Sequence, residues 1–187
     1  MRKIILPVWT AIGAGLIIVA LVLLASWGRK PTYRGATIPG QAAGTTSQVY
    51  LRGGLLQQNI GGAAPDTFLE LDTSESVPGF MTRDFTVHVN QVVSITLRNR
   101  STTGQEHGWV LVAPGTLGKS ERESKEAGGQ WGWIPNSTDV LAFVPLTQPG
   151  ESRTVLFRAP PNPGDYPFFC PFPGHSNAMN GVLHVVS

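Results

Sequence analysis

Beyond residue 66, short runs of β-branched and aromatic residues recur between turn signals, the pattern typical of strands that bury one face. No run of apolar residues at helical spacing competes with this pattern. We therefore predict an all-β sandwich or barrel. Its predicted strands are residues 67–71, 85–89, 92–98, 109–112, 141–145, 152–158, 166–169 and 182–186. Residues 115–133 interrupt the spacing, and their charged centre, 119–126, is either one short surface helix or a loop.

The N-terminal pattern is different. Residues 4–27 are 24 residues without a charge, and as a helix they would extend about 36 Å, enough to cross a hydrocarbon core of about 30 Å. A cleavable signal peptide is the competing interpretation, but its apolar region usually has about 7–15 residues. No A-x-A-like cleavage site closes the run. The pattern favours one transmembrane helix within residues 1–27.

Residues 28–65 are rich in Gly, Ala, Thr, Ser and Gln and contain no acidic residue, which predicts a tether. A flexible chain of this length has a root-mean-square span of about 30–37 Å. The exception is VYLRGGLL, residues 49–56, which either docks on the domain as an extra strand or belongs to the tether. The predicted organisation is an anchor (1–27), a tether (28–65) and one β domain (66–187).

Composition and charge exclude several classes of function. The chain has 187 residues and one cysteine, which excludes an intrachain disulfide, a four-thiolate zinc site and a cysteine-ligated iron–sulfur cluster. Residues 1–65 hold six basic and no acidic side chains, whereas residues 66–187 hold eight basic and twelve acidic ones. The predicted domain is therefore acidic, and it lacks the basic surface that nucleic-acid binding requires.

One segment, YPFFCPFPGHSNAMNGVLHV at residues 166–185, carries the chemistry, because it places Cys170, His175 and Met179 in a single loop. Each residue type alone is usually structural. Together, a thiolate, an imidazole and a thioether are soft to borderline ligands, and a second imidazole would complete the His₂Cys set with a weak axial Met that holds blue copper. The predicted cofactor is one copper ion that alternates between Cu(I) and Cu(II).

The second imidazole has to come from His88, His107 or His184. In both predicted strands that contain His88 and His184, the neighbouring apolar residues continue the core face, so these two histidines should point outward. His107 instead lies where a predicted strand begins, as expected for a ligand carried by a loop. The pattern therefore favours His107.

These residues resemble those of the cupredoxins, with the Cys-to-His-to-Met spacing of the azurin type. The wider pattern, from EHGWVLV at 106–112 through PGES at 149–152 to the Cys170 loop, is most similar to the auracyanin family, the blue copper carriers of filamentous anoxygenic phototrophs. The resemblance covers residues 67–187 and implies a Greek-key cupredoxin sandwich of about eight strands, with copper bound by His107, Cys170, His175 and Met179.

One position departs from the family pattern. The family usually has Asn after the first histidine ligand, and here Gly108 stands there. A side chain that would brace the ligand loops is lost, although the Gly108 backbone N–H can still donate to the Cys170 sulfur, as can that of Phe172.

The resemblance further implies a function without catalysis or a small-molecule substrate. We expect a single-pass membrane protein whose copper domain lies on the extracytoplasmic side. The expected donor of single electrons is a quinol-oxidising complex such as alternative complex III, and the expected acceptor is a photosynthetic reaction centre or its bound cytochrome.

Two other functions compete with this interpretation. Subunit II of a haem-copper oxidase would need a second cysteine and a further histidine for a dinuclear copper site, but these positions hold Gly174 and Ala178. A copper-delivery or storage protein is the other alternative, although such sites usually avoid an activated thiolate in a closed four-ligand cage.

Overall fold

The computed structural model describes residues 56, 60 and 62–187. The predicted membrane anchor and most of the predicted tether lie outside the described residues. None of the described helices is both long enough and apolar enough to cross a membrane.

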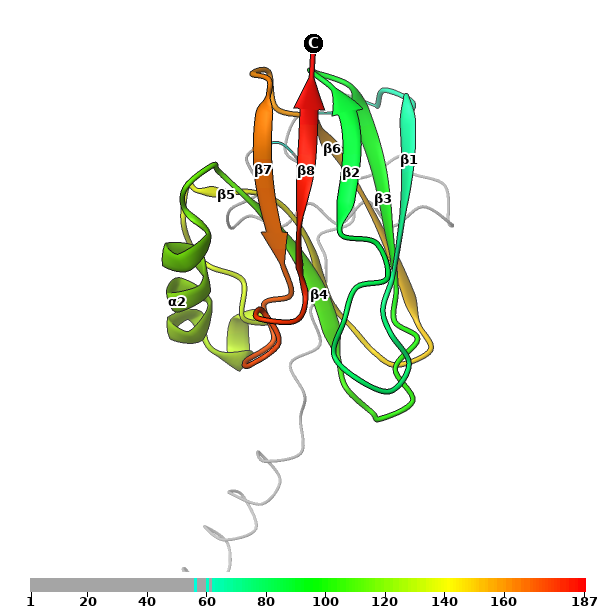
Figure 1. The fold of residues 1–187 in the computed structure, drawn as a ribbon, viewed down its shortest axis with the longest axis vertical. Helices are drawn as coiled ribbons and strands as arrows, with labels where there is room; N and C mark the ends of the chain where they lie inside the picture. Colours follow the sequence, from blue (N-terminus) through cyan, green and yellow to red (C-terminus); the bar gives the residue numbers. More distant parts are fainter. Residues whose placement is uncertain (1–55, 57–59, 61) are drawn as a thin grey trace, which may run out of the picture. The chain divides into compact units, whose positions relative to one another are not determined.

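The described chain is a sandwich of two β-sheets with one helix beside it (Figure 1). In chain order the elements are β1 (Thr67–Asp72), β2 (Asp84–His88), β3 (Val92–Arg98), β4 (His107–Val112), α2 (Leu117–Ala127), a 3₁₀ turn η2 (Gly129–Trp131), β5 (Val140–Thr147), β6 (Ser152–Arg158), β7 (Gly164–Phe169) and β8 (Asn180–Val186). All eight predicted strands are confirmed, with ends that differ by at most two residues.

The smaller sheet has the strand order β1-β3-β6, and the larger has the order β2-β8-β7-β4-β5. β1 runs parallel to β3 and β2 runs parallel to β8, whereas the other pairs are antiparallel. This connectivity brings the start of β4 and the connection between β7 and β8 to the same end of the sandwich (Figure 1).

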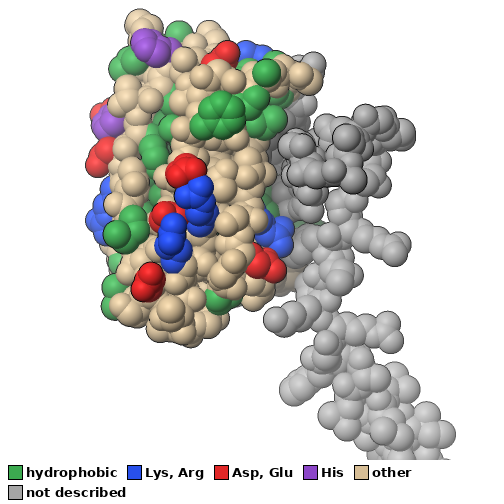
Figure 2. Space-filling view, turned by 90° about the vertical axis from the view of Figure 1, so that its right-hand side faces the viewer, with side chains coloured by type: hydrophobic (Ala, Val, Ile, Leu, Met, Phe, Trp, Pro, Cys, Tyr) green, Lys and Arg blue, Asp and Glu red, His purple; other side chains and the backbone are tan. Residues whose placement is uncertain are grey.

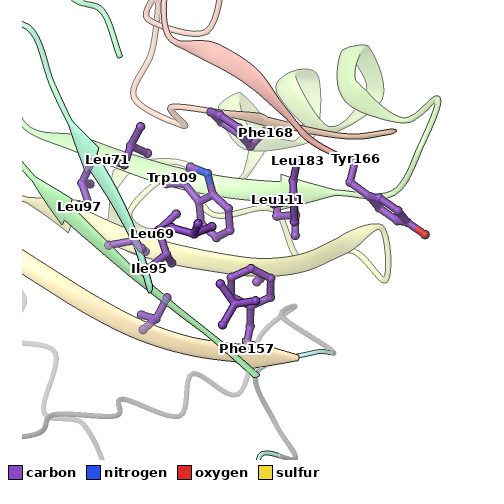
Figure 3. Packing of buried hydrophobic residues seen from close by; sticks show 14 of the residues in the cluster. Leu69, Leu71, Ile95, Leu97, Trp109, Leu111, Phe157, Tyr166, Phe168 and Leu183 are labelled. Atoms are coloured by element: carbon purple, nitrogen blue, oxygen red, sulfur yellow. The ribbon is translucent and has the colours of Figure 1, made fainter. Parts of the chain in front are cut away.

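The main core fills the space between the two sheets, with Trp109 of β4 at its centre (Figure 3). The Trp109 ring lies 5.7 Å from the Phe157 ring of β6 and 6.0 Å from the Phe168 ring of β7, measured between centroids. Burial of such aromatic side chains supplies most of the driving force that holds two sheets together. Because Phe168 lies two residues before Cys170, the core also fixes the strand that leads into the candidate metal loop.

A second, smaller cluster lies on the other face of the larger sheet and includes Phe143 and Phe169, with Leu117 of α2 packed against it. The only buried side chains of α2 itself are Ser120 and Ser124. The segment predicted as a helix or a loop is therefore a helix, followed by η2, but it lacks the apolar stripe that marks a surface helix in a sequence.

Of the segment predicted either to dock or to belong to the tether (49–56), only Leu56 is described. Its N–H donates to the Leu141 carbonyl of β5 at 2.9 Å, and its carbonyl accepts from the Arg158 N–H of β6 at 2.9 Å. Leu56 also packs against the main core. One residue therefore joins edge strands of the two sheets.

The outer face of the smaller sheet carries charges of both signs. Figure 2 shows acidic and basic side chains interspersed on the side of the molecule where β1 lies. Arg98 pairs with Glu70 and lies 3.8 Å from Asp72, and Arg100 pairs with Asp72 at 3.0 Å. This face therefore presents no continuous basic surface of the kind that binds nucleic acid.

Candidate metal centre

Three of the four predicted ligands converge at one end of the sandwich. His107 is the first residue of β4, Cys170 directly follows β7, and His175 lies in the connection between β7 and β8. The Cys170 Sγ atom lies 4.0 Å from His107 Nδ1 and 3.9 Å from His175 Nδ1. All three donor atoms lie within 4.8 Å of one another, and all three side chains are buried.

These separations suit a shared metal ion. Nitrogen and sulfur ligands bind such ions at about 2.0–2.3 Å, so two donor atoms on one ion lie about 3–4.6 Å apart. The donor set of two imidazoles and one thiolate is soft enough for copper in either oxidation state. The residues therefore fit the predicted copper ion in both geometry and chemistry.

Met179 belongs to the same loop and is fully buried. Its N–H donates to the His175 carbonyl at 2.8 Å, and its own carbonyl accepts from the Cys170 N–H at 2.8 Å. A further bond runs from the His175 N–H to the Phe172 carbonyl at 3.1 Å. These bonds tie the loop that carries Cys170, His175 and Met179 into one compact turn, and axial ligation by Met179 stays a prediction.

Burial sets the protonation of the three donor groups in the metal-free protein. It raises the pKa of Cys170 to about 11, an effect that backbone N–H groups of Gly108 and Phe172 partly oppose. It lowers the pKa of His107 to about 4, with a further contribution from the proximity of His175, and it also lowers the pKa of His175. At neutral pH both imidazoles are therefore ready to bind a metal, whereas the thiol first has to lose its proton.

Gly108 acts as predicted toward the sulfur, since its N–H donates to Cys170 Sγ at 3.5 Å. The structure adds that a side chain here has little room. A Cβ atom on Gly108 would lie 3.0 Å from the Val144 carbonyl oxygen, 3.2 Å from Pro171 Cδ and 3.3 Å from Leu146 Cδ2. Strand β5 and Pro171 of the Cys170 loop therefore occupy the space that a side chain at 108 would need.

The other two histidines do not join the cluster, as the strand alternation predicted. His88 Nδ1 lies 2.7 Å from the Ser187 carbonyl oxygen. His184 lies on the outside of β8, with Nδ1 2.7 Å from Asp165 and Nε2 3.4 Å from Asp84. These carboxylates raise the pKa of His184, mainly through the hydrogen bond with Asp165.

Two aromatic rings lie beside the His175 ring. The Phe172 ring lies 4.6 Å from it and the His107 ring 5.0 Å from it, measured between centroids. Only 5% of the His175 surface is exposed, and Phe172 and Pro173 are partly exposed beside it.

Three residues near the site have roles that the sequence does not predict. Arg83 donates to the Ala178 carbonyl at 2.6 Å, next to Met179 in the chain. Ser124 of α2 donates to the Trp133 carbonyl and lies 3.4 Å from the Pro171 carbonyl. Asn99 is buried among the loops at this end of the sandwich. Each residue acts over a long sequence separation, and the pattern around each gives no signal of a role.

Comparison with known proteins finds relatives of this chain. No family model matches the chain. The chain is 31% identical to Auracyanin-A of Chloroflexus aurantiacus over 127 residues, which is 66% of this chain and 76% of that protein. It is 34% identical over 127 residues to Auracyanin-B of the same organism, of which it spans only about half (49%).

Solved structures agree. The auracyanin of Roseiflexus castenholzii superimposes with a TM-score of 0.61 at 30% identity, covering 66% of this chain and 100% of that one. Auracyanin A, described as a "blue" copper protein from a green thermophilic photosynthetic bacterium, gives a TM-score of 0.60 at 30% identity over 64% of this chain and 98% of its own.

Proposed function

The chain belongs to the auracyanin family of cupredoxins, which are blue copper electron-transfer proteins, and from this premise we propose that it carries single electrons between membrane complexes as a tethered domain. It is an electron carrier and not an enzyme. The observation that carries the proposal is the buried cluster of His107, Cys170 and His175 beside Met179. When bound there, copper supplies one-electron chemistry by alternating between Cu(I) and Cu(II).

The protein's part in electron transfer is to hold the ligands still and keep water out. The buried His107 and Cys170 come from neighbouring elements of one sheet, and the bonds within the Cys170 loop fix His175 relative to Cys170. Ligands that do not rearrange between oxidation states lower the cost of each transfer, because less of the surroundings has to move. The hydrogen bond from Gly108 to the Cys170 sulfur stabilises its thiolate form.

We propose that the electron passes through the edge of His175. The surrounding Phe172 and Pro173 are apolar and partly exposed, which suits brief docking to a partner protein. Small apolar interfaces release quickly and depend little on salt. The proposed donor is a quinol-oxidising complex, and the proposed acceptor is a photosynthetic reaction centre or its bound cytochrome.

The proposed membrane attachment rests on the sequence alone, on the uncharged run within residues 1–27 followed by the Gly-rich stretch 28–65. One helix would fix the protein to the membrane, with the copper domain on the extracytoplasmic side. The tether would then keep the domain at raised effective concentration near its partners, which compensates for weak docking.

The test uses the full-length protein in vesicles that contain a quinol-oxidising complex and a reaction centre. We expect electron transfer between the two complexes to depend on the protein and to change little with salt. Pro173→Glu, which adds a carboxylate beside His175, should slow transfer, while Glu126→Gln, a change on the exposed surface of α2, should not. Equal rates with and without the protein, or an unaltered rate for Pro173→Glu, would overturn this route. Recovery of all the protein in the soluble fraction would overturn the membrane attachment.

A further inference from the structure

Asn99 is a buried polar residue directly after β3, and its side-chain amide is fully engaged. The Nδ2 group donates to the Gln105 carbonyl at 2.8 Å and to the Thr147 carbonyl at 2.9 Å. The Oδ1 atom accepts from the Thr73 hydroxyl at 3.2 Å and from the Ser101 N–H at 3.0 Å. An asparagine amide has two donor hydrogens and two acceptor lone pairs, so all four are used here.

The two carbonyls that Asn99 binds flank a metal ligand. Gln105 lies two residues before His107, and Thr147 is the residue opposite His107 in the pairing of β4 with β5. That pairing is irregular between His107 and Trp109. Such irregularities re-aim a side chain and leave the local ladder without its regular bonds. One amide group therefore links the two segments that meet at His107, next to the point where the strand pairing becomes irregular.

Asn99 is itself held in place. Its backbone N–H donates to the Glu151 carbonyl at 3.0 Å, and its carbonyl accepts from the Gly150 N–H at 2.8 Å. The Thr73 hydroxyl that donates to Asn99 also accepts from the Arg100 N–H at 2.9 Å. The amide is thus anchored to the end of β1 and to the turn before β6, and it transmits that rigidity to the loop before His107.

The residue that follows His107 cannot brace it, because Gly108 has no side chain and a Cβ atom there would lie 3.0 Å from the Val144 carbonyl oxygen. We propose that Asn99 is the positioning residue that holds His107 in its ligating place, through the Gln105 and Thr147 carbonyls. The proposal rests on the copper function proposed above. Residues that orient a metal-binding histidine usually form a hydrogen bond with that histidine directly. Asn99, eight positions before His107, would instead orient it through the backbone on either side.

The test compares copper-loaded, full-length variants. Asn99→Leu keeps the branched shape of the side chain but removes all four hydrogen bonds. Thr73→Val removes one of the two bonds to the amide oxygen, together with the bond from the Arg100 N–H, and leaves both donors to the His107 segments in place. Val93→Ala is the control for lost stability, because Val93 is buried at the opposite end of β3. The readouts are the electron paramagnetic resonance spectrum of the oxidised protein and the rate at which a chelator removes the copper.

We expect Asn99→Leu to alter the copper hyperfine splitting and to speed copper loss by about 10–100-fold, the usual effect of removing a support behind a ligand. Thr73→Val and Val93→Ala should keep the wild-type spectrum. A wild-type spectrum and copper-loss rate for Asn99→Leu would overturn the proposal, and so would equal spectral changes in Asn99→Leu and Val93→Ala. A wild-type protein without the blue charge-transfer band would instead overturn the copper function.

A measurement on the unaltered protein covers the case in which Asn99→Leu does not fold. The two side-chain N–H signals of Asn99 are followed by nuclear magnetic resonance in the Cu(I) protein transferred to heavy water. Hydrogen-bonded, buried amides exchange only when the structure opens, so these signals should outlast those of the exposed Asn136 by orders of magnitude. Exchange of the Asn99 amide as fast as that of Asn136 would contradict the proposal.

Discussion

Copper binding to the metal-free protein at pH 7 should release about one proton per ion, and that proton should come from Cys170. The pKa of Cys170 is about 11, so only about one thiol in 10⁴ is ionised at pH 7. The pKa of His107 is about 4, which leaves about one imidazole in 10³ protonated. His175 has a pKa below 6.5, so fewer than about a quarter of its side chains are charged at pH 7. The release should therefore lie between about 1.0 and 1.25 protons.

The same values predict how affinity varies with pH. Ionising a thiol four units below its pKa costs roughly 5 kcal/mol, and this cost offsets part of the metal–thiolate bond energy. Copper affinity should therefore rise about tenfold per pH unit from pH 7 upward, until the thiol ionises unaided near pH 11. Below pH 6.5 the slope should steepen, as His175 and then His107 take up protons in the metal-free form.

The assay is an anaerobic calorimetric titration with Cu(I) supplied from a weak competing ligand, repeated in buffers of different ionisation enthalpy. The dependence of the heat on the buffer counts the protons. The control is Cys170→Ser, which should release fewer than about 0.25 protons on any residual binding at pH 7. No release from the wild type would mean a preformed thiolate, and two or more protons would mean charged imidazoles. Either result would refute the view that burial sets these protonation states.

Three further predictions concern single residues. Met179→Gln replaces a soft thioether by a harder oxygen, which should stabilise Cu(II) and lower the reduction potential; an unchanged or higher potential in voltammetry would show that Met179 is not a ligand. Gly181→Ala should lower the free energy of unfolding in urea by about 1–3 kcal/mol or more, because its Cβ would clash with the Arg83 carbonyl oxygen and with Phe168 Cζ, whereas an unchanged midpoint would contradict that close approach. His184→Gln should destabilise the protein by less than about 1 kcal/mol, and more at pH 5.5 than at pH 9. Because the pKa of His184 is raised in the folded protein, the stabilisation from its protonated side chain is complete below the ordinary pKa of 6.5. This stabilisation is lost as pH rises through the folded-state pKa. A cost of His184→Gln in urea unfolding that does not depend on pH would show that this ion pairing does not stabilise the fold.

The strands and the ligand cluster could be predicted because their signals are local. Strands show as alternation within five to eight residues, and His175 and Met179 follow Cys170 within one loop. His107 comes from another strand, but it could be chosen because the alternation around His88 and His184 assigns both to the outside of the sheet. In each case a short stretch of sequence contains the physical reason for the outcome.

The supports of the site could not be predicted, because their partners are far apart in the chain. Asn99 in an Asn-Arg-Ser-Thr-Thr-Gly stretch has the composition of an ordinary turn, and only the fold brings it to Thr147. The same holds for Arg83 and Ala178, which are 95 residues apart. For a related reason the sequence does not distinguish a helix from a loop at α2, since a helix that buries two serines has no apolar periodicity.

The most direct test of the central claim is an optical and copper titration of the oxidised full-length protein, with Cys170→Ser beside it. We predict an intense blue or green thiolate-to-copper charge-transfer band that saturates at one copper per chain, disappears on one-electron reduction and returns on reoxidation. Cys170→Ser should lack the band. A wild-type protein that binds a full equivalent of copper but stays colourless, or a Cys170→Ser variant that keeps the colour, would contradict the account.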